Sequence, residues 1–329
     1  MIGYYIHHHG RGHLSRATAI ARELDEPVTG LSSLERPDDW PGEWVTLPLE
    51  ENVGPQDAEA NGRLHWVPIG DRGLRGRSAA VSKWIDAHDP ALIVVDVSVE
   101  IALLARLHGV RVVVIALPGE RTDPAHELGF DIATMILAAW PPAAKRMVAG
   151  VPAPTRILAV GAIGGRVSDP AQGPERVTSQ SVVVLGGAGG DEFTRSAIAA
   201  AEAETPEWTW EHFGGTGTWV PDVSRRLRQA SVVVTHAGEG ALADVSAARV
   251  PAVVIPQKRP FNEQFSTATE LLDDSWPAVV RAEWPDRGWL ELLESARALD
   301  GAKWRHWNDG LGARRAAQAI LGLVGERRA

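Results

Sequence analysis

The stretch SVVVTHAGEGALADVSAARVPAVVIPQKRPFNEQ, residues 231–264, decides the fold of this chain. Its first β-branched run ends at Thr235, a glycine-rich turn follows, and an alanine-rich segment leads to a second apolar run that ends at Pro256. This order predicts a strand, a loop, a helix and a further strand. Polar residues gather where the first strand ends and the helix begins, which is the edge where open α/β sheets bind ligands. The pattern favours a small ligand rich in hydroxyl groups, such as a nucleotide sugar.

Length, charge and cysteine content narrow the class of protein. The chain has 329 residues, which is long enough for two domains. A net charge of -9 argues against a nucleic-acid partner, and the absence of cysteine excludes disulfides, zinc thiolate sites and thiol nucleophiles. We see no secretory signal and no apolar run near the roughly 20 residues of a membrane span. We therefore expect a cytoplasmic protein and leave open a peripheral contact with the inner face of the membrane.

Strands alternate with helices along the chain, which predicts two doubly wound, mostly parallel sheets. Residues 48–77 are rich in Gly, Pro and Arg without a clear period, so we expect a long loop there, with solvated arginines or arginines that meet anionic lipid. The expected divisions are an N-terminal acceptor-side domain over residues 1–163, a linker over 164–180, a C-terminal donor domain over 181–308 and a C-terminal helix over 309–329. Packing of that helix back on the N-terminal domain is one option.

The turn GRGH follows the first strand and opens a helix. Gly12 lets the backbone approach a ligand, and His13 has the chemistry of a general base that removes a proton from an acceptor hydroxyl. Helix capping is an equally good reading of His13, and Asp96 or Asp123 is an alternative base. A dinucleotide fingerprint fails at Ser15, so NAD is not expected.

The three histidines that precede this turn are consecutive, at positions 7, 8 and 9. Side chains alternate in direction along a strand end, so we expect that the three do not share one metal ion. No metal site is therefore predicted.

Two further glycine turns end strands in the second half of the chain. The turn GGAGG lacks the Lys of a P-loop, and its backbone N–H groups suit a diphosphate; the turn around His236 repeats the pattern. Asp244 accepts hydrogen bonds from a ribose diol or only supports the helix dipole, and Glu263 with Gln264 holds a donor sugar or begins a solvated helix. The residues we assign to the diphosphate are Gly12, Gly187, Ala188, Gly189, His236, Gly238, Glu239 and Gly240.

In this order the segments resemble the GT-B glycosyltransferases, specifically the family 28 group, which includes the lipid II-forming N-acetylglucosaminyltransferase and the diacylglycerol galactosyltransferases. The stretch GALADVSAARVPAVVIP is similar to the ribose-binding helix of that group, with Asp244 seven residues before Pro251. Glu263 and Gln264 match its donor-sugar pair, and GGAGG occupies the place of its diphosphate turn. GRGH matches the N-terminal loop whose His13 lies near the acceptor.

The resemblance implies two Rossmann-like domains that face a cleft and catalyse inverting, metal-independent transfer of a sugar to a hydroxyl acceptor. A nucleotide-diphosphate sugar, UDP-linked, is the co-substrate, and no cofactor is expected. Relatives need no metal because helix dipoles and loop amides stabilise the departing diphosphate. The sugar is left open, as is the acceptor, which is lipid-linked, a glycan or a small molecule.

Two other functions fit the same architecture. A non-hydrolysing sugar-nucleotide epimerase would need several paired acids in the cleft, and the sequence places too few there. A non-catalytic nucleotide-sugar-binding subunit of a membrane-associated complex would bind a donor without turnover, and His13→Ala would leave it unaffected. A dehydrogenase ranks below both.

Overall fold

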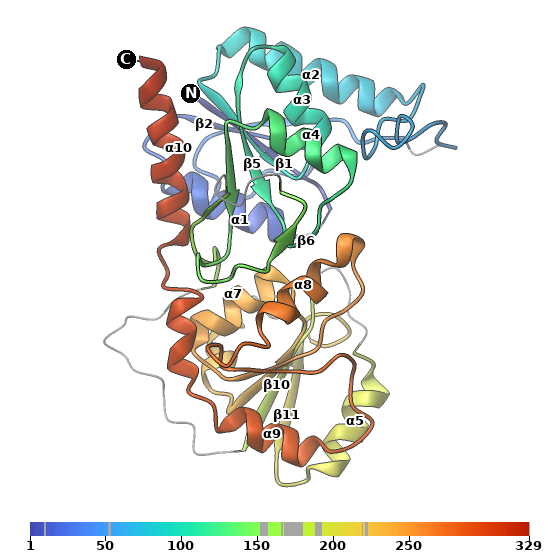
Figure 1. Cartoon of the computed structure of the whole chain (residues 1–329), viewed down its shortest axis with the longest axis vertical. Helices are drawn as coiled ribbons and strands as arrows, with labels where there is room; N and C mark the ends of the chain where they lie inside the picture. The colour runs from blue at the N-terminus through green and yellow to red at the C-terminus, as the bar shows by residue number, and fades with distance from the viewer. Residues whose placement is uncertain are drawn as a thin grey trace.

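Two lobes make up the chain, each built on a parallel β-sheet, in a computed structural model (Figure 1). The structure describes residues 1–9, 11–51, 54–151, 157–165, 167, 180–187, 193–218, 220 and 223–328. Most of the predicted linker, residues 164–180, lies outside these ranges. The prediction of two doubly wound α/β domains is confirmed.

The sheet of the first lobe has seven parallel strands whose central members are buried on both faces. β1 and β4 are IGYYI and LIVVD, and every residue of both strands is buried, as expected for a parallel sheet covered by helices. The strands, in their order across the sheet, are β3 (Glu43–Thr46), β2 (Val28–Ser32), β1 (Ile2–Ile6), β4 (Leu92–Asp96), β5 (Arg111–Ala116), β7 (Met135–Ala138) and β9 (Ile157–Ala159).

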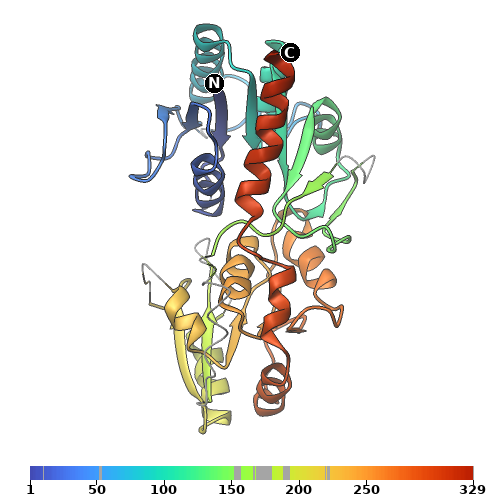
Figure 2. The same cartoon turned by 90° about the vertical axis from the view of Figure 1, so that its left-hand side faces the viewer.

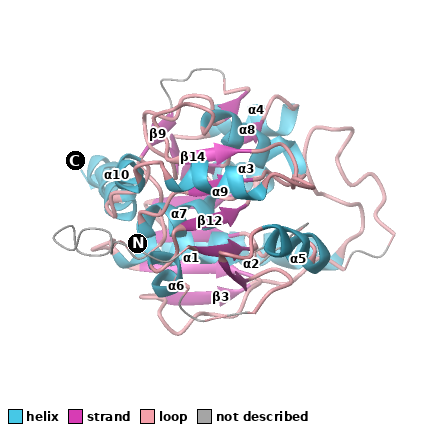
Figure 3. Cartoon of the chain, turned by 90° about the horizontal axis from the view of Figure 1, so that it is seen from below, coloured by secondary structure: helices cyan, strands magenta, loops and turns pink. Residues whose placement is uncertain are grey.

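Helices cover both faces of this sheet (Figure 3). Alternate residues of β1 explain this, because Tyr4 packs in a cluster with Ile20 and Ile320, whereas Tyr5 packs in another with Val81 and Trp84. The helices of this lobe are α1 (Arg11–Arg22), α2 (Arg72–His88), α3 (Val99–Leu107) and α4 (Pro124–Ile132), and a short pair β6 (Gly119–Glu120) and β8 (Val148–Ala149) lies beside them.

The predicted loop over residues 48–77 is too long at its C-terminal end. Asp71 caps α2 by accepting a hydrogen bond from the Leu74 amide at 2.7 Å, so the helix begins at Arg72. Arg77 is therefore helical, buried and paired with Glu50, and it is not a solvated loop residue. Two glycines in the first turns of α2 lower the helix propensity there, so the sequence pattern did not indicate where the helix begins.

The second lobe repeats the plan with five parallel strands. Its strand order is β11 (Thr209–Phe213), β10 (Ser181–Leu185), β12 (Val232–Thr235), β13 (Ala252–Val254) and β14 (Ala278–Val280). The helical elements are α5 (Arg195–Glu204), α6 (Ser224–Arg228), α7 (Glu239–Ala248), η2 (Pro260–Asn262), α8 (Glu263–Glu270), α9 (Trp289–Arg297) and η3 (Gly301–His306). Within the described part of the chain, no helix combines the length and apolar character that crossing a membrane requires.

The chain returns to the first lobe through its last helix, α10 (Gly312–Arg328), which runs along that lobe (Figure 2). Ile320 and Ala316 are fully buried in the cluster that includes β1 and α1, and Arg111 donates to the Leu323 carbonyl at 2.6 Å. Just before α10, the buried Asn308 side chain donates to the carbonyls of Gly164 and Ala243, at 3.0 and 3.1 Å. The chain passes between the lobes twice, once near Gly164 and once near Asn308. These hydrogen bonds connect both of those segments to α7.

Replacing Ile320 with alanine is expected to lower the free energy of unfolding by about 2–5 kcal/mol, because it removes a fully buried side chain and leaves a cavity. Gln318→Ala, on the exposed face of the same helix, is the matched control and should change that free energy by no more than about 0.5 kcal/mol. Urea unfolding measures both. Equal losses in the two variants would show that α10 does not dock on the first lobe.

Candidate active site

The candidate site lies between the lobes, at the edge where strands of the first lobe end and helices of the second lobe begin (Figure 1). Ion pairs that cross this interface include those from Arg16 to Glu239, from Arg121 to Glu263 and from Arg146 to Glu270. Glu239 and Glu263 are the first residues of α7 and α8. Helix N-termini present unpaired amides and a partial positive charge, so this side of the interface suits an anionic ligand.

Asp96 is the centre of the polar cluster on the first lobe. It is the last residue of β4 and is fully buried. Its carboxylate lies 2.9 Å from His13 Nδ1 and accepts two hydrogen bonds from Arg16, at 2.8 and 3.2 Å. His13 and Arg16 are three residues apart on α1, which places both side chains on one face of the helix. The structure thus joins the two residues that the sequence proposed as alternative bases.

The charges around Asp96 determine the protonation of this cluster. Burial by itself raises the pKa of Asp96, but Arg16 and His13 outweigh burial and hold that pKa well below its ordinary value. His13 Nδ1 also lies 3.1 Å from Arg16 Nη2, which can only donate, so the tautomer of this ring depends on whether Nδ1 pairs with Asp96 or with Arg16. In the tautomer whose Nδ1–H donates to Asp96, Nε2 carries the free lone pair that a general base needs.

Arg16 extends this cluster to the second lobe. Its remaining terminal nitrogen donates to Glu239 Oε2 at 2.8 Å, and the guanidinium is almost completely buried. Burial raises the pKa of Glu239, although Arg16 opposes that shift. One buried cation therefore bridges a carboxylate of each lobe.

The turn before α7 presents a histidine whose proton position is fixed by the backbone. His236 Nδ1 accepts a hydrogen bond from the Gly238 amide at 3.0 Å, so the ring proton lies on Nε2. Burial, with Arg259 nearby, lowers the pKa of His236 to about 4, which keeps the ring neutral at physiological pH. A Cβ atom at position 238 would lie only 2.5 Å from this imidazole, so the turn requires glycine there.

Three buried polar atoms around this turn lack a hydrogen-bond partner among the described residues. They are His236 Nε2, Gln257 Nε2 and Glu239 Oε1. Buried polar atoms are nearly always paired in folded proteins, because an unpaired one costs about 1–3 kcal/mol. Two of the three are N–H donors beside a helix N-terminus that no side chain caps. Their chemistry fits the oxygens of a bound phosphate.

The pair predicted to hold a donor sugar is at the start of α8. Gln264 is buried and its carbonyl oxygen accepts from the Gln257 amide at 2.9 Å, which leaves its NH2 group for a ligand. Glu263 Oε1 accepts from Arg121 at 2.7 Å. Arg121 belongs to the first lobe, so a residue of the acceptor side holds a residue of the donor side.

The structure places the other predicted residues around this centre. Asp244 is half-buried on α7, beyond Glu239 and Gly240 in the first turn. Gly12 is exposed in the first turn of α1, and Gly187 is half-buried after β10. Ala188 and Gly189 lie outside the described residues.

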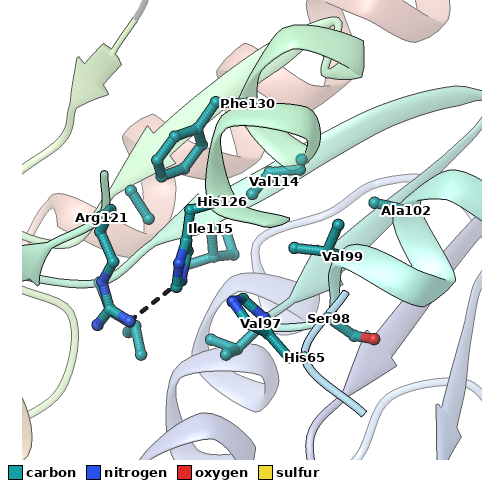
Figure 4. Close-up of a pocket in the computed structure, with 13 residues that line it drawn as sticks. His65, Val97, Ser98, Val99, Ala102, Val114, Ile115, Arg121, His126 and Phe130 are labelled. Atoms are coloured by element: carbon teal, nitrogen blue, oxygen red, sulfur yellow. Dashed lines mark hydrogen bonds between the residues drawn. The ribbon is translucent and has the colours of Figure 1, made fainter. Parts of the chain in front are cut away.

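A pocket opens in the first lobe, between the ends of β4 and β5 and helices α3 and α4 (Figure 4). In Figure 4, His126 and Ile115 lie on one side of it and Val99 and Ala102 on the other. Most of its lining is apolar. The polar side chains of the lining are those of His65, Ser98, Arg121 and His126.

An aromatic residue of the second lobe lies beside this pocket. The Phe261 ring centroid is 4.7 Å from that of His126 and 5.6 Å from that of His65, and the Arg121 guanidinium lies over the ring at 4.6 Å. Phe261 and Asn262 both have a left-handed backbone, with φ of 57° and 55°. Strained backbone of this kind is concentrated at functional sites.

The sequence analysis missed several of these residues. Arg16 had a usable signal, a basic residue one helical turn after His13. His65 comes from the predicted long loop, and Arg121 and His126 come from a segment interpreted as a polar loop, in which neither has a predicted role. Their meeting with Phe261 depends on how the lobes dock. No local pattern could have shown it.

The expectation that the three histidines after β1 point in alternate directions is wrong. β1 ends at Ile6, so these residues form a bend rather than a strand. The rings of His7, His8 and His9 lie together, with centroid distances of 4.2–5.0 Å. Their nitrogen atoms lie within 4.8 Å of one another, which is compatible with one metal ion.

Comparisons with known proteins place this site in a family context. Residues 181–283 match the Glycosyltransferase family 28 C-terminal domain. The chain is similar to the glycotransferase of kitacinnamycin (TM-score 0.70, 18% identity, 98% of each chain covered). It is also similar to MurG of Acinetobacter baumannii (0.59, 13%, 99% of each chain). A third similar structure is Arabidopsis thaliana UGT89C1 complexed with UDP-L-rhamnose (0.63, 13%, 99% of this chain and 98% of that one).

A comparison with curated proteins gave no match. The structural likeness confirms the GT-B fold over the whole chain, and the domain match confirms the family 28 resemblance in the second lobe.

Replacing Asp96 with alanine is expected to lower the free energy of unfolding by about 3–5 kcal/mol, because it leaves the buried Arg16 short of a counter-charge. Asp39→Ala is the matched control. Asp39 also pairs with an arginine, Arg22, but both side chains are about half exposed, so the loss there should be no more than about 1 kcal/mol. Urea unfolding near neutral pH measures both, and equal losses would contradict the buried bridge.

The same variant has an expected pH signature. Because the pKa of Asp96 is lowered in the folded chain, its contribution to stability is complete above its ordinary value of 3.8 and is lost as the pH falls towards the folded value. The difference in stability between the wild type and Asp96→Ala should therefore shrink below about pH 4. A constant difference down to the acid limit would argue against an ionised Asp96.

Proposed function

We propose that this family 28-like glycosyltransferase transfers a sugar from a UDP-linked donor to an acceptor hydroxyl, with inversion at the anomeric carbon and without a metal ion. The observation that carries the proposal is the position of the His13–Asp96 pair, which lies across the lobe interface from the N-terminus of α7 and is joined to it by Arg16 and Glu239. A proton acceptor and an anion-binding helix end thus face one another.

The second lobe supplies the donor site in this proposal. The α7 amides and the His236 Nε2–H group bind the diphosphate, with the turn at Gly187 alongside. Asp244 binds the ribose hydroxyls, and Glu263 with the Gln264 amide binds the sugar. The UDP-L-rhamnose bound to the Arabidopsis enzyme, which shares the fold, supports a UDP-linked donor.

Transfer follows from these positions in one displacement. The acceptor oxygen attacks the anomeric carbon, the bond from that carbon to the diphosphate breaks, and its electron pair leaves with the UDP. His13 Nε2 takes the acceptor proton, while the Asp96 carboxylate holds Nδ1–H and stabilises the imidazolium that forms. The helix amides stabilise the charge on the departing diphosphate, which is why no metal is required.

The pocket of the first lobe supports an acceptor with a largely apolar part, because its lining is mostly aliphatic. An extended glycan would need many more polar partners. The acceptor hydroxyl would enter at the polar rim, where the lobes meet.

Arg121 connects this pocket to the donor sugar. It is buried, and it holds Glu263 Oε1 at 2.7 Å, so Glu263 Oε2 is the oxygen that would face a sugar hydroxyl. Closure of the lobes therefore orders the sugar site and excludes water from the donor.

Donor binding is expected to depend on Asp244. Thermal-shift measurements with UDP, GDP, dTDP and NAD should show stabilisation by UDP, and Asp244→Ala should remove most of it because the ribose hydroxyls lose their acceptor. Asp286→Ala, an exposed acid elsewhere in the same lobe, is the control and should behave as wild type. Stabilisation by none of the diphosphates would overturn the proposal.

Turnover is expected to depend on His13. His13→Ala should lower kcat by about 10²–10⁴-fold, because it removes the proton acceptor, and should leave the UDP-induced thermal shift intact. Release of UDP from a UDP-sugar with acceptor present measures kcat. His108→Ala, an exposed histidine at the end of α3, is the control. If the chain binds the donor but shows no turnover, and if His13→Ala changes nothing, the protein would instead be a binding subunit.

A further inference from the structure

The bend after β1 brings three imidazole side chains together without a counter-ion among them. His7 and His8 stack at a centroid distance of 4.9 Å, and His9 lies 4.2 Å from His8. Their nitrogen atoms all lie within 4.8 Å of one another. His7 and His8 are half-buried and His9 is exposed, so the cluster is shielded on one side and open to solvent on the other.

A carboxylate from another segment completes the surroundings of this cluster. Glu50, which follows β3 in sequence, has Oε1 at 3.4 Å from His8 Nε2, and its side chain is almost completely buried. Its other oxygen is paired with Arg77, which fixes the position of the carboxylate. Three imidazoles and one carboxylate oxygen are ligand types that zinc accepts.

Another histidine cluster in the chain serves as a comparison. His65, Asp123 and His126 also place their ligand atoms within 4.8 Å of one another. There, however, Arg121 donates to His126 Nε2 at 3.1 Å, so the ring proton lies on Nδ1, the atom that would have to bind the metal. Metal binding at this second cluster is therefore disfavoured by the positive charge of Arg121 and by the proton on His126 Nδ1.

Of the side chains in the described ranges, none donates a hydrogen bond to the rings of the first cluster. The hydrogen bond that His7 Nδ1 makes is with the backbone amide of His9, in an exposed position where water can replace it. Arg77, which pairs with Glu50 beside the cluster, also donates to the Pro48 carbonyl. At Zn–N distances of about 2.0–2.1 Å, tetrahedral ligands lie roughly 3.3 Å apart, so the nitrogens need to converge only by side-chain rotation.

We propose that His7, His8 and His9, with Glu50 beside them, bind one transition-metal ion of the zinc type. The ion would tie the turn between β1 and α1 to the segment after β3. The His7 ring lies beside the proposed proton acceptor, with a centroid distance of 5.9 Å to His13, and His13 is not among the proposed ligands. The metal-site proposal does not depend on the proposed function, because the transfer reaction itself needs no metal.

The test is a zinc titration of the full chain, produced without an affinity tag and stripped of metal by chelator and dialysis. Isothermal calorimetry should show one Zn²⁺ bound per chain, and zinc should raise the melting temperature. The double variant His8→Ala/His9→Ala should bind zinc at least about tenfold more weakly, because it removes two ligands. Mg²⁺, which prefers oxygen ligands, should give no heat.

A matched double variant locates the ion. His65→Ala/His126→Ala removes two histidines from the other cluster and should keep the wild-type zinc affinity. The proposal is overturned if wild-type chain binds no zinc at millimolar concentration, or if zinc binding is lost in this second variant and kept in the first. Circular dichroism of both variants without zinc checks that they are folded. UDP binding is measured separately, so a failure here leaves the proposed function standing.

Discussion

Arg16 is a buried cation that two carboxylates neutralise, one from each lobe. A buried guanidinium without a partner would cost several kcal/mol, so the position of Arg16 is stable only where Asp96 and Glu239 both reach it. Asp96 is held by the central strand β4, and Glu239 by the first turn of α7. Because His13 lies on the same face of α1, the contact that joins the lobes also orients the imidazole against Asp96.

The two lobes contribute different groups to the candidate site. The first lobe carries the His13–Asp96 pair and an apolar pocket, and the second carries helix N-termini and unpaired N–H groups. Away from the site, the interface is built from apolar groups, from the Arg146–Glu270 ion pair and from Asn308, which donates to the carbonyls of Gly164 and Ala243. Polar groups of the interface are thus paired with one another or lie where a ligand can pair with them.

The two histidine clusters show how neighbours decide what one residue type does. At His126, a buried arginine fixes the ring proton and a nearby carboxylate accepts it, so the ring is a neutral hydrogen-bonding group, and burial lowers its pKa to about 4. Among the side chains that the structure describes, no arginine donates to the rings of His7, His8 and His9, and the His9 backbone amide donates to His7 Nδ1. The difference comes from Arg121, which no feature of the histidines themselves indicates.

The sequence by itself determined the fold class and the order of the elements, because hydrophobic period and glycine turns are local properties of the chain. It also indicated His13, Asp96, His236 and Gln264 as candidates, since each follows or opens a regular element at a strand's carboxyl edge. Only the tertiary structure decided which of these residues act together. The pairing of His13 with Asp96, the bridge through Arg16, and the meeting of Arg121 with Glu263 join positions 80–223 residues apart. Such contacts depend on how helices dock and how the lobes close, and the local pattern around each residue carries no information about either.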